Sequence, residues 1–145
     1  VSGIFSTSDV TQKTLDLIDR IFSKIGKVYF FKDEDYIDKI TSISGSSPAY
    51  IFYFIESLIE SAINNFGFDK NTAKEITLQV IKGSIALIDN NPEVEISQLR
   101  QNVTSKKGTT EQAILTFDKY NLAQIISEAE IACYNQAKKI SKTYI

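Results

Sequence analysis

The sequence contains no histidine, no tryptophan and no methionine, and it has only one cysteine, Cys133. Without histidine the chain lacks the side chain that normally changes charge near neutral pH, and Ser-His and Cys-His catalytic pairs are excluded. A single cysteine excludes an intrachain disulfide, and the absence of histidine also excludes a conventional zinc site. Cys133 lies in the run 128–134, where we expect a small core residue without a chemical role.

Composition places the chain among ordinary globular domains. Its 145 residues match one domain with at most a piece of another, and we interpret the start without methionine as a sign of a fragment. Lysine and arginine number 16 against 18 acidic residues, interspersed along the chain, so no basic face for a nucleic acid is expected. The most apolar stretch, 48–55, is too short to cross a bilayer, and no signal peptide is visible. We therefore expect a cytoplasmic protein without nucleic-acid or membrane partners.

Residues 1–33 differ from the rest of the chain in their sequence pattern. The polar cluster 6–9 is a helix-start signal, apolar residues then recur at helical spacing, and Gly26 is placed to end the helix. Residues 27–32 are rich in aromatic residues and predict a short strand, the only good strand that the sequence indicates. A helix followed by one strand is the pattern of this segment.

From Glu34 onward the pattern is helical. Gly67 is placed to end one long helix, Asp69 or Asn71 to cap the next, and the run 90–92 to break that one. The predicted helices are 35–42, 48–66, 72–88, 96–103, 110–120 and 122–142. The second begins with a run, 50–55, that is apolar on all sides, as expected of a helix covered all round. A partner subunit is one cover for it, and a central position in a monomeric bundle is the other.

Two small-residue turns open helices. In the first, Ser47 is predicted to cap a helix that continues with Pro48. In the second, Thr109 and Gln112 have the spacing of a capping box, so a helix should begin within 108–110. Free amides at such a start favour a carboxylate ligand, and the adjacent lysines would add positive potential. When either turn is taken alone, an ordinary solvated loop and helix cap is the better interpretation.

The two turns together resemble a known enzyme family. Residues 44–50 are similar to the SGSGPAY motif of pyrroline-5-carboxylate reductases, and 104–110 to their TSPGGTT motif. The likeness runs from Glu34 to about residue 138, while 1–33 resemble the end of the family's nucleotide domain. It implies a mainly α fold, a helical-bundle dimerisation domain of the 6-phosphogluconate dehydrogenase C-terminal type at 34–145, preceded by a helix-strand remnant of a Rossmann domain at 1–33.

The resemblance also implies a reaction, the reduction of 1-pyrroline-5-carboxylate to L-proline with NADPH or NADH, without a metal. It places the substrate carboxylate on Ser105, Gly108, Thr109 and Thr110, with Thr110 as the catalytic residue that hydrogen-bonds the ring nitrogen. The cofactor would bind upstream of Val1, so the chain alone should be inactive, and the domain should form a homodimer or higher homo-oligomer.

Two departures from the family keep alternatives open. Ser47 replaces a glycine, and Lys106-Lys107 replaces the usual Pro-Gly, which removes one rigid and one permissive residue. One alternative is therefore a non-catalytic dimerisation module of a diverged reductase. Another is the helical domain of a 6-phosphogluconate or hydroxyacid dehydrogenase. Glu56 and Glu60 have the spacing of a carboxylate pair, but without histidine partners a solvated helix face is the better interpretation.

Overall fold

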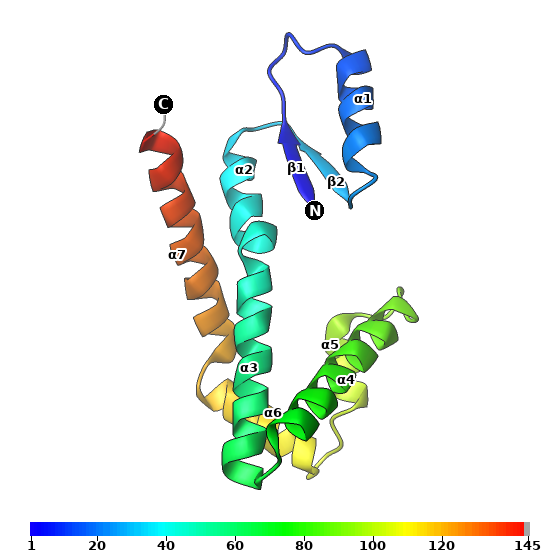
Figure 1. Cartoon of the computed structure of the whole chain (residues 1–145), viewed down its shortest axis with the longest axis vertical. Helices are drawn as coiled ribbons and strands as arrows, with labels where there is room; N and C mark the ends of the chain where they lie inside the picture. The colour runs from blue at the N-terminus through cyan, green and yellow to red at the C-terminus, as the bar shows by residue number, and fades with distance from the viewer. Residues whose placement is uncertain (144–145) are drawn as a thin grey trace. The chain divides into compact units, whose positions relative to one another are not determined.

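The computed structural model describes residues 1–143, which form two compact units. One unit combines Val1–Tyr50 with residues 126–143, and the other is Ile51–Ile125 (Figure 1). The elements in chain order are β1 (Ser2–Phe5), α1 (Gln12–Phe22), β2 (Val28–Phe31), α2 (Asp35–Ile40), the π-helix η1 (Thr41–Gly45), α3 (Ser47–Phe66), α4 (Lys70–Asp89), α5 (Ile96–Asn102), α6 (Thr109–Lys119) and α7 (Leu122–Thr143). The mainly α fold is confirmed.

The N-terminal segment is a β-α-β unit, so the expectation of a single strand was wrong. β1 pairs with β2 in parallel, from Ser2 opposite Val28 to Phe5 opposite Phe31. α2 packs closely on β1, because a Cβ atom added to Gly3 would lie 2.7 Å from Ile40 Cγ2. The serine and glycine in β1 carry little strand propensity, and the strand depends on pairing with a segment about 25 residues away.

Helix ends follow their capping residues. Thr11 caps α1, later than the predicted cluster 6–9, and α1 ends at Phe22, before Gly26. Asp69 is the cap of α4 because its carboxylate accepts hydrogen bonds from Asn71 N and Thr72 N, at 3.0 and 3.1 Å. Gly67 ends α3 in the left-handed conformation at φ 72°, and Asn90 ends α4. These two ends are as predicted.

The first of the two turns is not a turn. Residues 41–45 form a π-helix that joins α2 to α3, and Ser47 is already helical. The Ser47 hydroxyl donates to the Ile43 carbonyl at 2.6 Å, whereas an N-cap hydroxyl would accept from an amide. The prediction that Ser47 caps the helix was therefore wrong. Hydroxyl-to-carbonyl bonds within the helix make this run of serines compatible with helical geometry.

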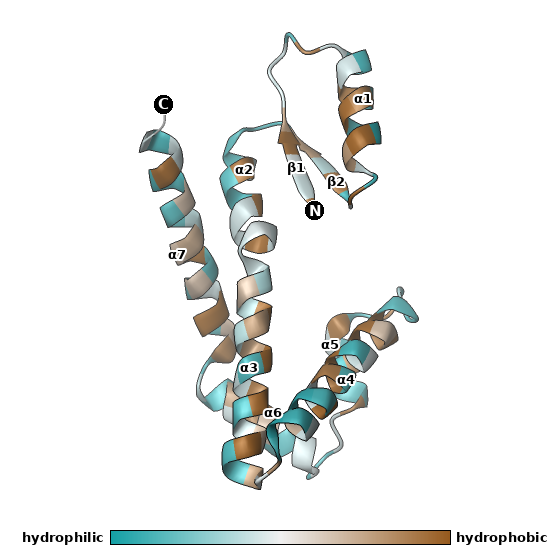
Figure 2. Ribbon diagram, viewed as in Figure 1, coloured by the Kyte–Doolittle hydropathy of each residue, from teal (hydrophilic) through white to brown (hydrophobic). Residues whose placement is uncertain are grey.

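Little of the chain is buried by the chain itself. Among residues 1–143 the buried side chains are Ser42, Ala73, Thr77 and Leu99. Large apolar residues are exposed on α3, α4 and α7, and Figure 2 shows hydrophobic residues along these helices. Within the described residues no helix is long and apolar enough to cross a membrane.

Candidate functional site

The turn between α5 and α6, together with the first two residues of α6, contains every residue that the sequence assigned to the substrate. α6 begins at Thr109, with Gly108 as its N-cap, so the predicted helix start within 108–110 is confirmed. Thr109 and Thr110 are therefore the first two helical residues, and both are exposed. The amides of a helix's first turn have no partner within the helix. Two threonine hydroxyls thus lie beside amides that can receive an anion.

Close packing at Gly108 shapes this turn. The Gly108 amide donates to the Ser105 carbonyl at 3.0 Å. A Cβ atom on Gly108 would collide with the Ser105 hydroxyl and would lie 3.0 Å from the Ser105 carbonyl oxygen. A larger residue here would therefore require the Ser105 hydroxyl and carbonyl to shift, although a φ of -83° suits any residue. Ser105 is brought directly against the start of α6, while the Gly108 amide is already occupied.

Lys107 has the one unusual backbone conformation in the turn. Its φ is 60°, in the left-handed region that glycine adopts without cost and lysine does not. This is the position where the sequence departs from the glycine of the family motif. The backbone has thus kept a glycine-like conformation although the residue is lysine. Both Lys106 and Lys107 are exposed, so their ammonium groups add positive potential near the turn.

A carboxylate from α6 replaces the predicted capping box. Thr109 is helical rather than a cap, so the Thr109-Gln112 pair was a wrong assignment. Instead the Glu111 carboxylate accepts a hydrogen bond from the Lys107 amide, at 2.7 Å between N and Oε2. Glu111 is the third residue of α6 and is half-buried. The signal for it was present, because a glutamate at the third helical position is the usual partner of a capping box.

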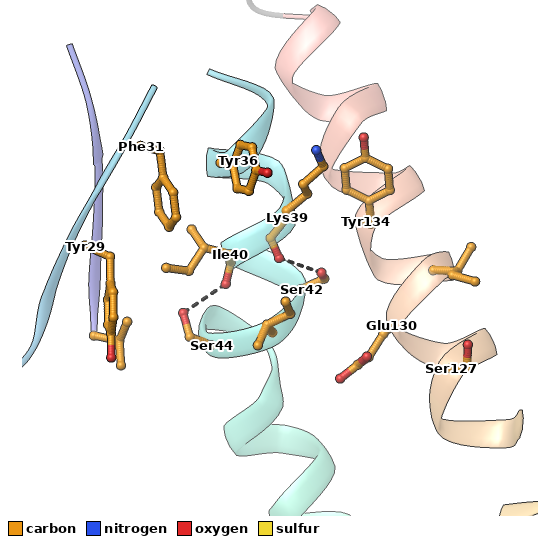
Figure 3. Close-up of a pocket in the computed structure, with 13 residues that line it drawn as sticks. Tyr29, Phe31, Tyr36, Lys39, Ile40, Ser42, Ser44, Ser127, Glu130 and Tyr134 are labelled. Carbon is orange, nitrogen blue, oxygen red and sulfur yellow. Dashed lines mark hydrogen bonds between the residues drawn. The ribbon is translucent and has the colours of Figure 1, made fainter. Parts of the chain in front are cut away.

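A second feature, a groove of about 780 Å³, lies in the unit that contains the sheet. Figure 3 shows aromatic rings of β2 and α2 on one side and α7 on the other. The lining residues include Tyr29, Phe31, Tyr36, Lys39, Glu130 and Tyr134. Sequence reasoning missed this groove, because its walls come from segments about 100 residues apart.

An ion-pair cluster joins α2 to α7 beside the groove. Asp35 accepts from Lys39 at 2.7 Å, from Lys138 at 2.9 Å and from the Tyr134 hydroxyl at 2.8 Å. The hydrogen bond from Lys39, followed by those from Lys138 and Tyr134, holds the pKa of Asp35 well below its usual value. Asp35 therefore stays ionised at any ordinary pH and ties the two helices together.

Cys133 is half-buried rather than part of an apolar core. Its thiol donates to the Ser46 hydroxyl at 3.1 Å, across the contact of α7 with the residue preceding α3. The expectation of a small apolar core residue was thus only partly correct. Within residues 1–143 no group of three or more potential metal ligands comes together.

Comparison with known proteins places this architecture in a family. A sequence model described as pyrroline-5-carboxylate reductase dimerisation matches residues 34–140. The chain belongs to this family. Its first residue in the match, Glu34, is the residue where the sequence pattern becomes wholly helical. The match favours the reductase interpretation over the 6-phosphogluconate and hydroxyacid dehydrogenases.

Individual reductases are similar over nearly the whole chain. The pyrroline-5-carboxylate reductase of Vibrio alginolyticus is 35% identical over 99% of this chain and 53% of the relative, and that of Haemophilus influenzae is 30% identical over the same shares. The solved reductase of Coxiella burnetii is 39% identical with a TM-score of 0.84, over 95% of this chain and 51% of that one. The Plasmodium falciparum reductase, solved with NADP bound, is 29% identical with a TM-score of 0.85, over 94% and 52%. This chain thus spans about half the length of the relatives it matches.

Proposed function

We propose that this chain is the dimerising and substrate-holding half of a pyrroline-5-carboxylate reductase. The complete enzyme would reduce 1-pyrroline-5-carboxylate to L-proline with NADPH or NADH in the cytoplasm. The observation that carries the proposal is the turn before α6, where Ser105 packs against Gly108 and two threonines begin the helix. Family membership and the names of the relatives support the reaction.

The turn suits a small carboxylate. A substrate carboxylate would accept hydrogen bonds from the first-turn amides of Thr109 and Thr110 and from the Ser105 hydroxyl. The Thr110 hydroxyl would hydrogen-bond the ring nitrogen and so orient the imine. The Gly108 amide already donates to Ser105, so we propose that Gly108 contributes by its small size. Each remaining bond orients the substrate rather than taking part in bond breaking.

The described residues do not fit a dinucleotide. The connection from β1 to α1, residues 6–11, contains no glycine, whereas a dinucleotide fold holds the pyrophosphate on a glycine-rich loop at this kind of turn. We therefore propose that NAD(P)H is bound outside these residues and that 1–33 and 34–145 belong to a nucleotide domain and a helical domain, respectively. The family match, which begins at residue 34, supports this boundary.

The dimer part of the proposal is supported by exposed apolar side chains. Ile51, Phe52, Tyr53 and Phe54 are 54%, 69%, 72% and 41% exposed. Four successive residues point to all sides of a helix, so no single face of this chain can cover them. A second copy of the chain is the cover we propose, and the dimerisation family to which the chain belongs supports it.

The second candidate is a dimerisation module without catalytic activity. The left-handed Lys107 favours it, since a strained residue in the substrate turn is what a diverged site would retain. The two functions differ in one measurable property. A reductase half must bind a small carboxylate at the turn, whereas a dimerisation module need not.

The test joins this chain to the nucleotide-binding half of the Vibrio alginolyticus reductase and follows NAD(P)H oxidation with pyrroline-5-carboxylate. Thr110→Val should lower kcat/KM by roughly 10- to 100-fold, the effect of losing a hydrogen bond to a charged group. Thr116→Val is the matched control, because the Thr116 hydroxyl only donates to the Gln112 carbonyl within the same helix. Equal kinetics for both variants would reduce Thr110 to a structural residue. The unmodified chain alone should show no turnover.

A further inference from the structure

The Glu111 carboxylate lies in an unusual place for a helix-start glutamate. In a capping box, the third helical residue accepts from the amide of the cap residue. Here the cap residue is Gly108, and its amide is already bound to the Ser105 carbonyl at 3.0 Å. Glu111 therefore reaches one residue further, to the Lys107 amide at 2.7 Å.

The hydrogen bond from Glu111 involves Lys107, the one residue of the turn whose backbone conformation is unfavourable for its residue type. Lys107 is left-handed at φ 60°, and a lysine left to itself prefers negative φ. The φ angle of Lys107 sets how its amide is oriented relative to α6, which carries Glu111. A charged acceptor at 2.7 Å thus stabilises the left-handed state against the local preference of the lysine.

The conformation of Lys107 in turn sets the position of its neighbours. Gly108 follows directly, and it packs against Ser105 closely enough that an added Cβ atom would collide with the Ser105 hydroxyl. If Lys107 changed to negative φ, Gly108 and the start of α6 would move relative to Ser105. The close packing of Ser105 on Gly108, at the start of α6, would then be lost.

We infer that Glu111 is a positioning residue, whose carboxylate holds Lys107 in the left-handed conformation and so keeps Ser105 and the α6 amides arranged for a carboxylate ligand. The ligand part of this inference rests on the proposed function. Glu111 does not itself receive the substrate, because like charges repel. The two exposed lysines, Lys106 and Lys107, offset its negative charge.

Three variants of the full chain separate the roles of Glu111. Glu111→Ala removes the acceptor, Glu111→Gln keeps an acceptor without the charge, and Glu111→Ala with Lys107→Gly replaces the strained lysine by a residue that adopts positive φ unaided. Two quantities are measured by NMR for each, amide exchange at residue 107 and affinity for L-proline as the probe ligand. Amide exchange reports the turn without any ligand.

Glu111→Ala should accelerate exchange at residue 107 and weaken L-proline binding, each by on the order of ten-fold or more. Glu111→Gln should retain binding, because it keeps an acceptor and removes a repelling charge. In the double variant, binding should return to within a few-fold of the parent, which is a coupling that independent sites do not show.

Unchanged exchange in Glu111→Ala would overturn the inference, and so would a double variant that binds as weakly as Glu111→Ala. A parent chain that does not bind L-proline, but whose residue 107 exchanges faster in Glu111→Ala, would refute the proposed function and support the role of Glu111 in the turn. The two failures are therefore distinguishable.

Discussion

The conformation of Lys107 makes a quantitative prediction about stability. Lysine in the left-handed region costs roughly 1–2 kcal/mol relative to its preferred conformation, and Lys107→Gly removes this cost. Glycine also makes the unfolded chain more flexible, which costs about 0.4–1 kcal/mol. The Lys107 side chain is exposed, and the hydrogen bond to Glu111 uses the backbone amide, so little else is lost. Lys107→Gly should therefore stabilise the protein by about 0.5–1 kcal/mol.

Lys106→Gly is the matched control one residue earlier. Lys106 is also exposed but is not among the residues with positive φ. Lys106→Gly therefore removes no unfavourable φ from the folded state, and it should lower the free energy of unfolding by about 0.4–1 kcal/mol because glycine makes the unfolded chain more flexible. The two variants have identical compositions, and their free energies of unfolding should differ by about 1–2 kcal/mol.

Urea unfolding measures the difference, with both variants at one protein concentration because the stability of an oligomer depends on it. For a chain of 145 residues the entropy of unfolding is about 0.3 kcal/mol/K, so the variants should also differ by about 3–6 °C in Tm. Equal stability of the two variants would mean that residue 107 is not left-handed in solution, and the argument about Glu111 would fail with it.

Three further predictions concern the rest of the chain. Ser2 N donates to the Lys27 carbonyl at 2.9 Å, and parallel pairing then directs the amides of Tyr29 and Phe31 toward β1. These two amides should therefore exchange with solvent more slowly than the other two amides of β2. Uniformly fast exchange would show that the strands do not pair. Phe52→Asp should dissociate the dimer in sedimentation at micromolar concentration while Lys13→Asp does not, and a folded monomeric parent would contradict the dimer. Asp35→Asn should weaken the attachment of α7. Because folding lowers the pKa of Asp35, the contribution of its carboxylate to the free energy of unfolding is full above about pH 4 and is lost as the pH falls toward the folded pKa. A parent whose stability stays flat below pH 4 would contradict this role.

Helix positions could be predicted because their ends depend on local chemistry. Asp69 caps α4 through amides two and three residues away, and Gly67 ends α3 with its own backbone conformation. No distant residue is needed for either decision. The candidate site could be proposed from the sequence for the same reason, since it is a single segment of six residues at a helix start.

Features that depend on distant residues escaped prediction. The strand at Ser2–Phe5 exists through its pairing with β2, and the groove has α7 as one wall. The prediction for the serine-rich segment 41–47 was wrong for a different reason. Serine hydroxyls are typical of caps, but they also bond to carbonyls one turn back in a continuing helix. The sequence alone does not decide between the two, and Pro48 made the cap look more favourable.

The apolar run 50–55 could be interpreted from the sequence, but this chain alone does not cover it. The run indicates cover on every side, yet most of it is exposed within this chain. The dimer proposed above would supply the cover that this chain does not itself provide for the run 50–55.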